Sequence, residues 1–336
     1  MMPGELKRVF ALILAFSGLP GCQRYWVCDE EEAPRTSRLP ERLSDTGLYA
    51  DLASDRTAPD VAAYRPQFAL WSDGADKRRW VSLPRGSVID TSDMDNWRFP
   101  QGSKFWKEFS VEGKRVETRL LYKSGPTDDD WIALSYVWNE AQDEAIAAPW
   151  GVVDARGDHD VPAAGECMAC HGGRRGRVLG FSAIQLAESK DPPADGEAPA
   201  AIDLHELIER EQLSDLPSDH LEVPGNSVER AALGYLHANC SHCHNQARPE
   251  SSGARCFDPR KDFDFTLSVN SLDSPQSTPV YRTAMGSAFE PGNPDGSKAI
   301  DLVSDRGLFK QMPPLATEHV DTEAVANLRL WVAGLR

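Results

Sequence analysis

Polar residues alternate with β-branched and apolar ones along residues 116–122, and two further strand candidates, at 105–111 and 131–138, flank this segment. Alternation with a period of two predicts strands that bury one face. The connections at 112–114 and 124–129 are short and contain glycine, which favours antiparallel pairing of neighbouring strands. The pattern therefore predicts an antiparallel β-meander within residues 61–150.

The second half of the chain has a helical period instead. Val325, Leu328, Trp331, Val332 and Leu335 recur every three or four residues, which predicts an amphipathic helix over 322–335. Shorter helices are expected at 43–52, 178–186, 203–211 and from an N-cap at Ser227 through His237. The fold class predicted is α+β, a Trp-rich antiparallel β domain followed by a mainly helical one.

Composition adds two constraints. The formal net charge is −16, which argues against a nucleic-acid partner and suits a protein partner with a basic docking surface. Residues 71–150 are rich in tryptophan, with seven positions expected mainly in the core and in part against a bound group: Trp71, Trp80, Trp97, Trp106, Trp131, Trp138 and Trp150.

The N-terminus is typical of an exported chain. Lys7 and Arg8 precede an apolar run at 9–16, which is too short for a membrane span of about 20 residues but fits a signal-peptide core. The sequence that ends at Cys22 resembles a bacterial lipobox, so Cys22 is expected to be acylated. Alternatives are an ordinary secretory signal or a first helix of the fold. Cys28 and Cys256 are then left to pair or stay free.

The sequence Cys-x-x-Cys-His occurs twice, as motif one at residues 167–171 and motif two at 240–244. In this motif the cysteines attach covalently to haem and the adjacent histidine binds the iron. Two covalently bound haem c groups are therefore expected, on Cys167, Cys170 and His171 and on Cys240, Cys243 and His244. The alternatives are one structural zinc site, disulfides or a redox pair.

The second axial ligand distinguishes the two motifs. Met312 lies in an extended Met-Pro-Pro sequence before the last helix and is expected to be the sixth ligand of haem two, together with His244. Haem one has only scattered candidates, namely Met94, His159, His205, His220, His237 and Met285. If none of them binds, His171 would hold a five-coordinate iron with an open face.

The residues around motif two, the Pro-Gly-Asn-Pro sequence at 291–294, the Met312 segment and the last helix resemble a class I cytochrome c domain. That resemblance implies the same attachment and ligand residues. Sequences at 68–80, 99–109, 136–139 and 178–186 resemble a bacterial dihaem c-type cytochrome family of unassigned role. The β-meander before motif one is also similar to the cytochrome P460 and cytochrome c′-β fold, in which a lysine is cross-linked to the haem; Lys104 or Lys107 is the counterpart to consider.

These observations predict a signal peptide at 1–21, a tether at 22–60, a β-rich haem-binding domain at 61–190, a linker at 191–226 and a cytochrome c-like domain at 227–336. The function expected is electron transfer by an exported protein, in the periplasm or lipid-anchored to the outer face of a bacterial membrane. The alternative is a dihaem redox enzyme, peroxidase-like or acting on a small molecule, with haem one as its open reaction centre.

Overall fold

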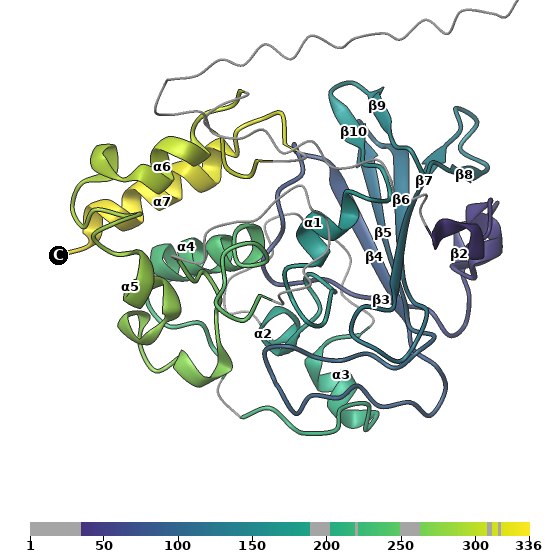
Figure 1. Cartoon of the computed structure of the whole chain (residues 1–336), viewed down its shortest axis with the longest axis horizontal. Coiled ribbons are helices and arrows are strands. Elements are labelled where there is room, and N and C mark those ends of the chain that lie inside the picture. The colour runs from purple at the N-terminus through teal and green to yellow at the C-terminus, as the bar shows by residue number, and fades with distance from the viewer. Residues whose placement is uncertain (1–34, 189–201, 219–220, 249–262, 308–310, 315–316) are drawn as a thin grey trace, which may run out of the picture.

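The computed structural model describes residues 35–188, 202–218, 221–248, 263–307, 311–314 and 317–336 (Figure 1). The predictions for the signal peptide, Cys22, Cys28, Cys256 and His220 lie outside these residues. Antiparallel sheets and several helices make up the described chain, which confirms the α+β class. None of the helices in the described ranges is long and apolar enough to cross a membrane.

The main sheet has six antiparallel strands in the order β3-β4-β5-β6-β7-β8. They are β3 Ala62–Ala63, β4 Asp76–Ser82, β5 Lys104–Val111, β6 Lys114–Lys123, β7 Trp131–Trp138 and β8 Ala145–Ala147. Two small sheets pair β1 Tyr49–Asp51 with β2 Arg56–Thr57, and β9 Val152–Arg156 with β10 His159–Val161. The three predicted strands are thus confirmed as β5, β6 and β7.

The β5–β6 turn explains why this hairpin forms. Glu112 and Gly113 have φ angles of 52° and 74°, so both central residues are left-handed, as a two-residue hairpin turn matching strand twist requires. The turn sets a register in which Phe105 lies opposite Leu121 and Lys107 opposite Arg119.

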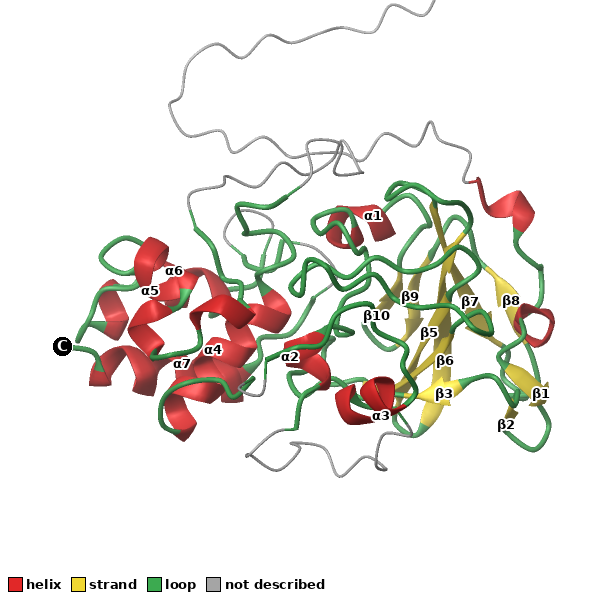
Figure 2. Cartoon of the chain, turned by 90° about the horizontal axis from the view of Figure 1, so that it is seen from below, coloured by secondary structure: helices red, strands yellow, loops and turns green. Residues whose placement is uncertain are grey.

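The two faces of the main sheet are covered by different parts of the chain (Figures 1 and 2). One face packs Trp80, Trp106, Leu120 and Tyr136 against residues from the 39–63 segment. The other, called the inner face here, packs Val81, Phe105, Leu121, Trp131 and Ala133 against the region of α1 to α3. Short helices in this region are α1 Cys167–His171, α2 Ala183–Leu186 and α3 Leu204–Glu209.

The remaining α-helices gather at the end of the molecule away from the sheet (Figure 2). They are α4 Ser227–Asn239, α5 Pro279–Ala284, α6 Lys298–Val303 and α7 Thr322–Gly334. Leu328, Trp331 and Val332 of α7 are buried against Leu233 and Leu236 of α4, in what is called the C-terminal core here. Short 3₁₀ turns complete the list, at Arg35–Arg38, Leu43–Thr46, Val269–Ser271, Pro275–Ser277 and Pro294–Gly296.

Several local predictions need correction. The helix expected at 43–52 is only a 3₁₀ turn, because Gly47 takes a φ of 90° and the next residues pair as β1. The helix expected at 178–186 shrinks to α2, since Gly180 has a φ of 81°. The N-cap of α4 is Asn226 rather than Ser227. Of the seven tryptophans expected in the core, Trp71 is only partly buried and Trp150 is 69% exposed.

Candidate functional site

Motif one is a single helical turn, α1, beside the inner face of the sheet (Figure 1). Cys167, Cys170 and His171 are spaced by three and four residues, so the helix places all three on one side. All three remain partly exposed, whereas Ala169 between them is 1% exposed and faces the core. The helical turn therefore leaves the reactive groups accessible while its other side anchors it.

The ring of His171 is held in one orientation. Its Nδ1 lies 2.6 Å from the carbonyl oxygen of Arg177, an acceptor, so Nδ1 carries the proton and Nε2 keeps its lone pair. The Arg177 guanidinium in turn donates to the carbonyl of Gly172 at 2.6 Å, which closes the loop after α1. Burial lowers the pKa of His171 to about 4, so the ring is neutral at neutral pH. A neutral imidazole oriented through its second nitrogen is the form that binds metal.

Motif two forms the same kind of turn at the end of α4. Cys240 is the C-cap, and its carbonyl oxygen accepts hydrogen bonds from the backbone N–H of Cys243 at 3.1 Å and of His244 at 2.8 Å. Cys240, Cys243 and His244 are partly exposed. α4 ends directly before the motif and holds it in place, because Asn226 and Glu229 close a capping box at the start of the helix and its apolar side packs in the C-terminal core.

The structure brings Met312 to the same core as motif two. Met312 and Cys240 both pack against the C-terminal core, and the Met312 backbone N–H donates to the Leu302 carbonyl oxygen at 2.9 Å. The His244 ring packs edge-on to Phe265, with ring centroids 5.5 Å apart. Met312 is therefore positioned in the neighbourhood that the sequence predicted, and its role as a ligand stays a prediction.

The two motifs contact each other directly. The Asn245 side chain donates to the Gly173 carbonyl oxygen at 3.1 Å, across 72 residues of chain. A Cβ atom on Gly173 would lie 1.6 Å from the carbonyl oxygen of His242, so only glycine permits this approach. The Cys170 thiol hydrogen-bonds with that of Cys243, which lowers the pKa of Cys170 and raises that of Cys243. The segments that carry the motifs therefore form one site.

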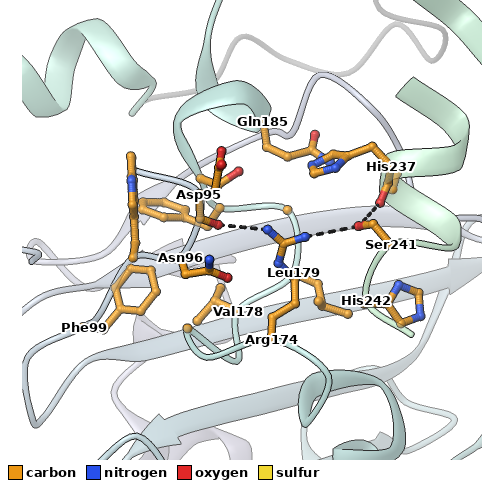
Figure 3. Close-up of a pocket in the computed structure, with 16 residues that line it drawn as sticks. Asp95, Asn96, Phe99, Arg174, Val178, Leu179, Gln185, His237, Ser241 and His242 are labelled. Atoms are coloured by element: carbon orange, nitrogen blue, oxygen red, sulfur yellow. Dashed lines mark hydrogen bonds between the residues drawn. The ribbon is translucent and has the colours of Figure 1, made fainter. Parts of the chain in front are cut away.

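A small cavity of about 40 Å³ lies beside this contact, enough for a few water-sized molecules (Figure 3). The Arg174 guanidinium crosses it and donates to the Asp95 carbonyl oxygen at 2.9 Å and to Ser241 Oγ at 3.3 Å. His237 lines the cavity, and its Nδ1 accepts the backbone N–H of Leu267 at 3.0 Å. Arg174 thus links the 95–99 loop to motif two.

The inner face of the sheet carries charged residues where it lies near motif one. Arg79, Lys107 and Arg119 lie directly opposite one another on β4, β5 and β6. Glu117 is fully buried and bonds Arg119 at 2.5 Å and His159 Nε2 at 2.9 Å. Burial alone would raise the pKa of Glu117, but Arg119 and His159 lower it to about 2.

These charges act on motif one itself. Arg119 interacts electrostatically with Cys167 and Cys170, and Lys107 with His171. Burial, followed by the neighbouring cations, holds the pKa of Lys107 well below its usual range. This row of cations was not predicted from the sequence. The available signal was one charged residue at an inward position of each of three neighbouring strands, where alternation predicts an apolar one.

The two lysines considered for a cross-link lie on opposite faces. Lys107 is on the inner face with motif one, while Lys104 points to the other face and donates to the Thr46 carbonyl oxygen at 2.7 Å. Alternation along β5 makes this separation unavoidable, because three residues apart means opposite sides. Only Lys107 therefore stays in the vicinity of motif one.

The candidate sixth ligands of haem one also separate. Met94 packs in the same cluster as Cys167, and His159 lies on the inner face, bonded to Glu117. His205 is on the surface beside Glu209, with its side chain 77% exposed. Two more lie in the second half of the molecule: His237 on α4, beside the cavity, and Met285 in the C-terminal core.

Motif one presents the residue types that covalent haem attachment would use. Its two cysteines and histidine lie on one side of a helical turn, and His171 keeps Nε2 available. Across the part of the chain that the structure describes, no three His, Cys, Asp or Glu side chains converge as a metal site would require. Comparison of the chain with protein-family models, curated proteins and solved structures gives no significant match.

Proposed function

We propose that this protein is an exported dihaem c-type cytochrome that transfers electrons between its two haems and a partner protein. The single observation that carries the proposal is the direct contact of the two Cys-x-x-Cys-His segments through Gly173, His242 and the thiols of Cys170 and Cys243. Groups attached to these segments would be held close together in one rigid unit. Two independent attachment motifs with no shared role would not need such contact.

The chain's own residues have defined roles in this proposal. Cys167 and Cys170, and Cys240 and Cys243, would form the thioethers; His171 and His244 would bind the irons, with Met312 on the second face of haem two. When bound, the two haems would supply one-electron redox chemistry. The Arg177 carbonyl orients His171, and the capping box of α4 fixes the position of motif two.

The test is the haem content of the mature protein from a host able to attach haem c. Intact mass and the pyridine haemochrome spectrum should show two haem equivalents. Cys240→Ala with Cys243→Ala should leave one, and Cys167→Ala with Cys170→Ala should leave the other. A protein that carries no haem, or zinc alone, would contradict the proposal.

The location and partner follow from the sequence and belong to the same proposal. The basic start, the apolar run and the lipobox-like end at Cys22 support export and a lipid anchor on the outer face of a bacterial membrane. The net charge of −16 supports a redox partner with a basic docking surface. Electron exchange with such a partner should slow as ionic strength rises.

A second candidate is a dihaem redox enzyme in which haem one is the reaction centre. The observation in its favour is the cluster of charged groups near His171, among them Lys107 and Arg119. Binding of carbon monoxide or cyanide to one haem of the resting or reduced protein would support it. Two low-spin haems with neither ligand bound would exclude it.

A further inference from the structure

A row of three cations crosses the inner face of the sheet. Arg79, Lys107 and Arg119 are directly paired across β4, β5 and β6. Like charges in directly opposite positions destabilise a sheet, and buried charges cost free energy unless they are paired. The direct pairing of Lys107 with Arg119 therefore has a cost in free energy, which a bound anion would offset.

Lys107 and Arg119 converge on one point. The Lys107 ammonium lies 4.7 Å from the centroid of the Phe109 ring, and the Arg119 guanidinium carbon lies 4.4 Å from the same centroid. Both long side chains therefore lean along the sheet toward Phe109, itself 1% exposed. Their charges stand next to each other rather than diverging into solvent.

One carboxylate, that of Glu117, lies at this cluster, and both of its oxygens already accept hydrogen bonds. Glu117 is bonded through both oxygens to Arg119 and through one of them to His159. Within the described residues, no carboxylate lies within ion-pair distance of the Lys107 ammonium, which lies over the Phe109 ring instead. Lys107 and Arg119 thus place two basic groups beside one carboxylate.

The cluster is reachable and faces motif one. The Arg119 side chain is 27% exposed and Lys107 is partly exposed, although both belong to the inner face. Arg119 acts on Cys167 and Cys170, and Lys107 acts on His171. A ligand between sheet and α1 would touch the cations and the motif together.

We propose that Lys107 and Arg119, flanked by Arg79, form a binding site for an anionic oxygen ligand, a carboxylate or small oxyanion, held between the sheet and motif one. Charge-assisted hydrogen bonds from lysine and arginine to such oxygens are among the strongest in proteins. Two sources share this chemistry: a propionate of the haem on motif one, and a free small anion. Binding of a haem propionate rests on the proposed function, whereas binding of a free anion does not.

The test compares Lys107→Met with Lys104→Met, a control on the same strand but the opposite face. Sulfate and acetate, which are poor iron ligands, are titrated into the full mature protein by calorimetry at low ionic strength. If the site takes a free anion, the wild type binds saturably, Lys107→Met binds roughly tenfold more weakly or not at all, and Lys104→Met binds like the wild type. The anion should also raise the melting temperature of the wild type and of Lys104→Met only.

If a haem propionate occupies the site, neither anion binds the wild type, and one of the two reduction potentials is lower in Lys107→Met than in the wild type and in Lys104→Met. Removing a cation beside a carboxylate disfavours the reduced haem, which explains the direction. Absence of anion binding together with unchanged potentials in Lys107→Met overturns the inference. A protein without haem overturns the proposed function but leaves the calorimetric result readable.

Discussion

Gly173 is the residue on which the contact between the motifs depends. Replacing it by alanine places a methyl group 1.6 Å from the His242 carbonyl oxygen and 2.7 Å from the Arg248 guanidinium. Backbone must then move, and we expect Gly173→Ala to lower the free energy of unfolding by about 1–3 kcal/mol or more. Chemical denaturation of both variants checks this, with Gly165→Ala as control because nothing lies within 4 Å of its Cβ position. Equal stability of the two would show that the segments are not in contact.

Glu117 predicts how stability depends on pH. Its pKa is 4.5 in ordinary surroundings and about 2 here, because Arg119 and His159 outweigh its burial. A carboxyl group whose pKa is lowered by folding stabilises the fold at any pH above its pKa in the unfolded chain. That contribution is lost as the pH falls through its pKa in the folded chain. At about 1.4 kcal/mol per pKa unit, about 3 kcal/mol should be lost between pH 5 and 2.

The check is denaturation of the wild type and Glu117→Gln across that range. The variant should be less stable at pH 7, by roughly 3 kcal/mol, since Arg119 then lacks its carboxylate. Its stability should also fall less steeply than that of the wild type toward low pH. Parallel pH profiles would show that Glu117 is not the titrating group.

Single residues were readable from the sequence only where chemistry fixes their spacing. The six cysteines and histidines of the motifs stand in two five-residue runs, and attachment chemistry requires that arrangement wherever it occurs. Lys107 offered no such signal. Its position beside motif one depends on the β5–β6 register and on where α1 docks, which are tertiary properties.

At the scale of elements, the start of α4 fixes the position of motif two. The Asn226 side chain accepts the Glu229 backbone N–H at 3.0 Å, and the Glu229 carboxylate accepts the Asn226 N–H at 2.9 Å. Asn226→Ala should therefore cost about 1 kcal/mol of stability. Ser227→Ala is the matched control and should cost little, since Ser227 is the first helical residue rather than the cap. Calorimetric melting of both variants measures the difference. A larger loss of stability in Ser227→Ala than in Asn226→Ala would indicate that Ser227 is the N-cap, as predicted from the sequence.

Elements with a long, regular pattern were predicted well, and short ones were not. β7 is a nearly continuous apolar run of eight residues and α7 has a helical period over thirteen residues, and both formed as expected. The segment at 43–52 contains apolar residues at helical spacing, but Gly47 and the pairing of β1 with β2 decide its structure. A strand of three residues paired with one of two is too short to show a periodic pattern in the sequence.

At the scale of the whole molecule, the contact between the motifs could not have been predicted. Gly173 and Asn245 are 72 residues apart, and the described chain between them includes α2, α3 and α4. The sequence around either residue therefore gives no sign that the two meet. The division into a β-rich and a cytochrome c-like domain stays a prediction. Arg174, whose guanidinium joins Asp95 to Ser241, shows that residues of both predicted domains share one site.

The adjacency of Cys170 and Cys243 has a consequence for how this protein is made. In the folded chain each thiol already has the other as its neighbour. An oxidising compartment would join two such thiols into a disulfide and so remove one attachment sulfur from each motif. If the chain is exported and carries haem as proposed, biogenesis has a required order: both cysteine pairs have to be modified while the chain is still open, and docking of the two segments has to be the last step. Cells that delay attachment should accumulate a dead-end species locked by that one bond.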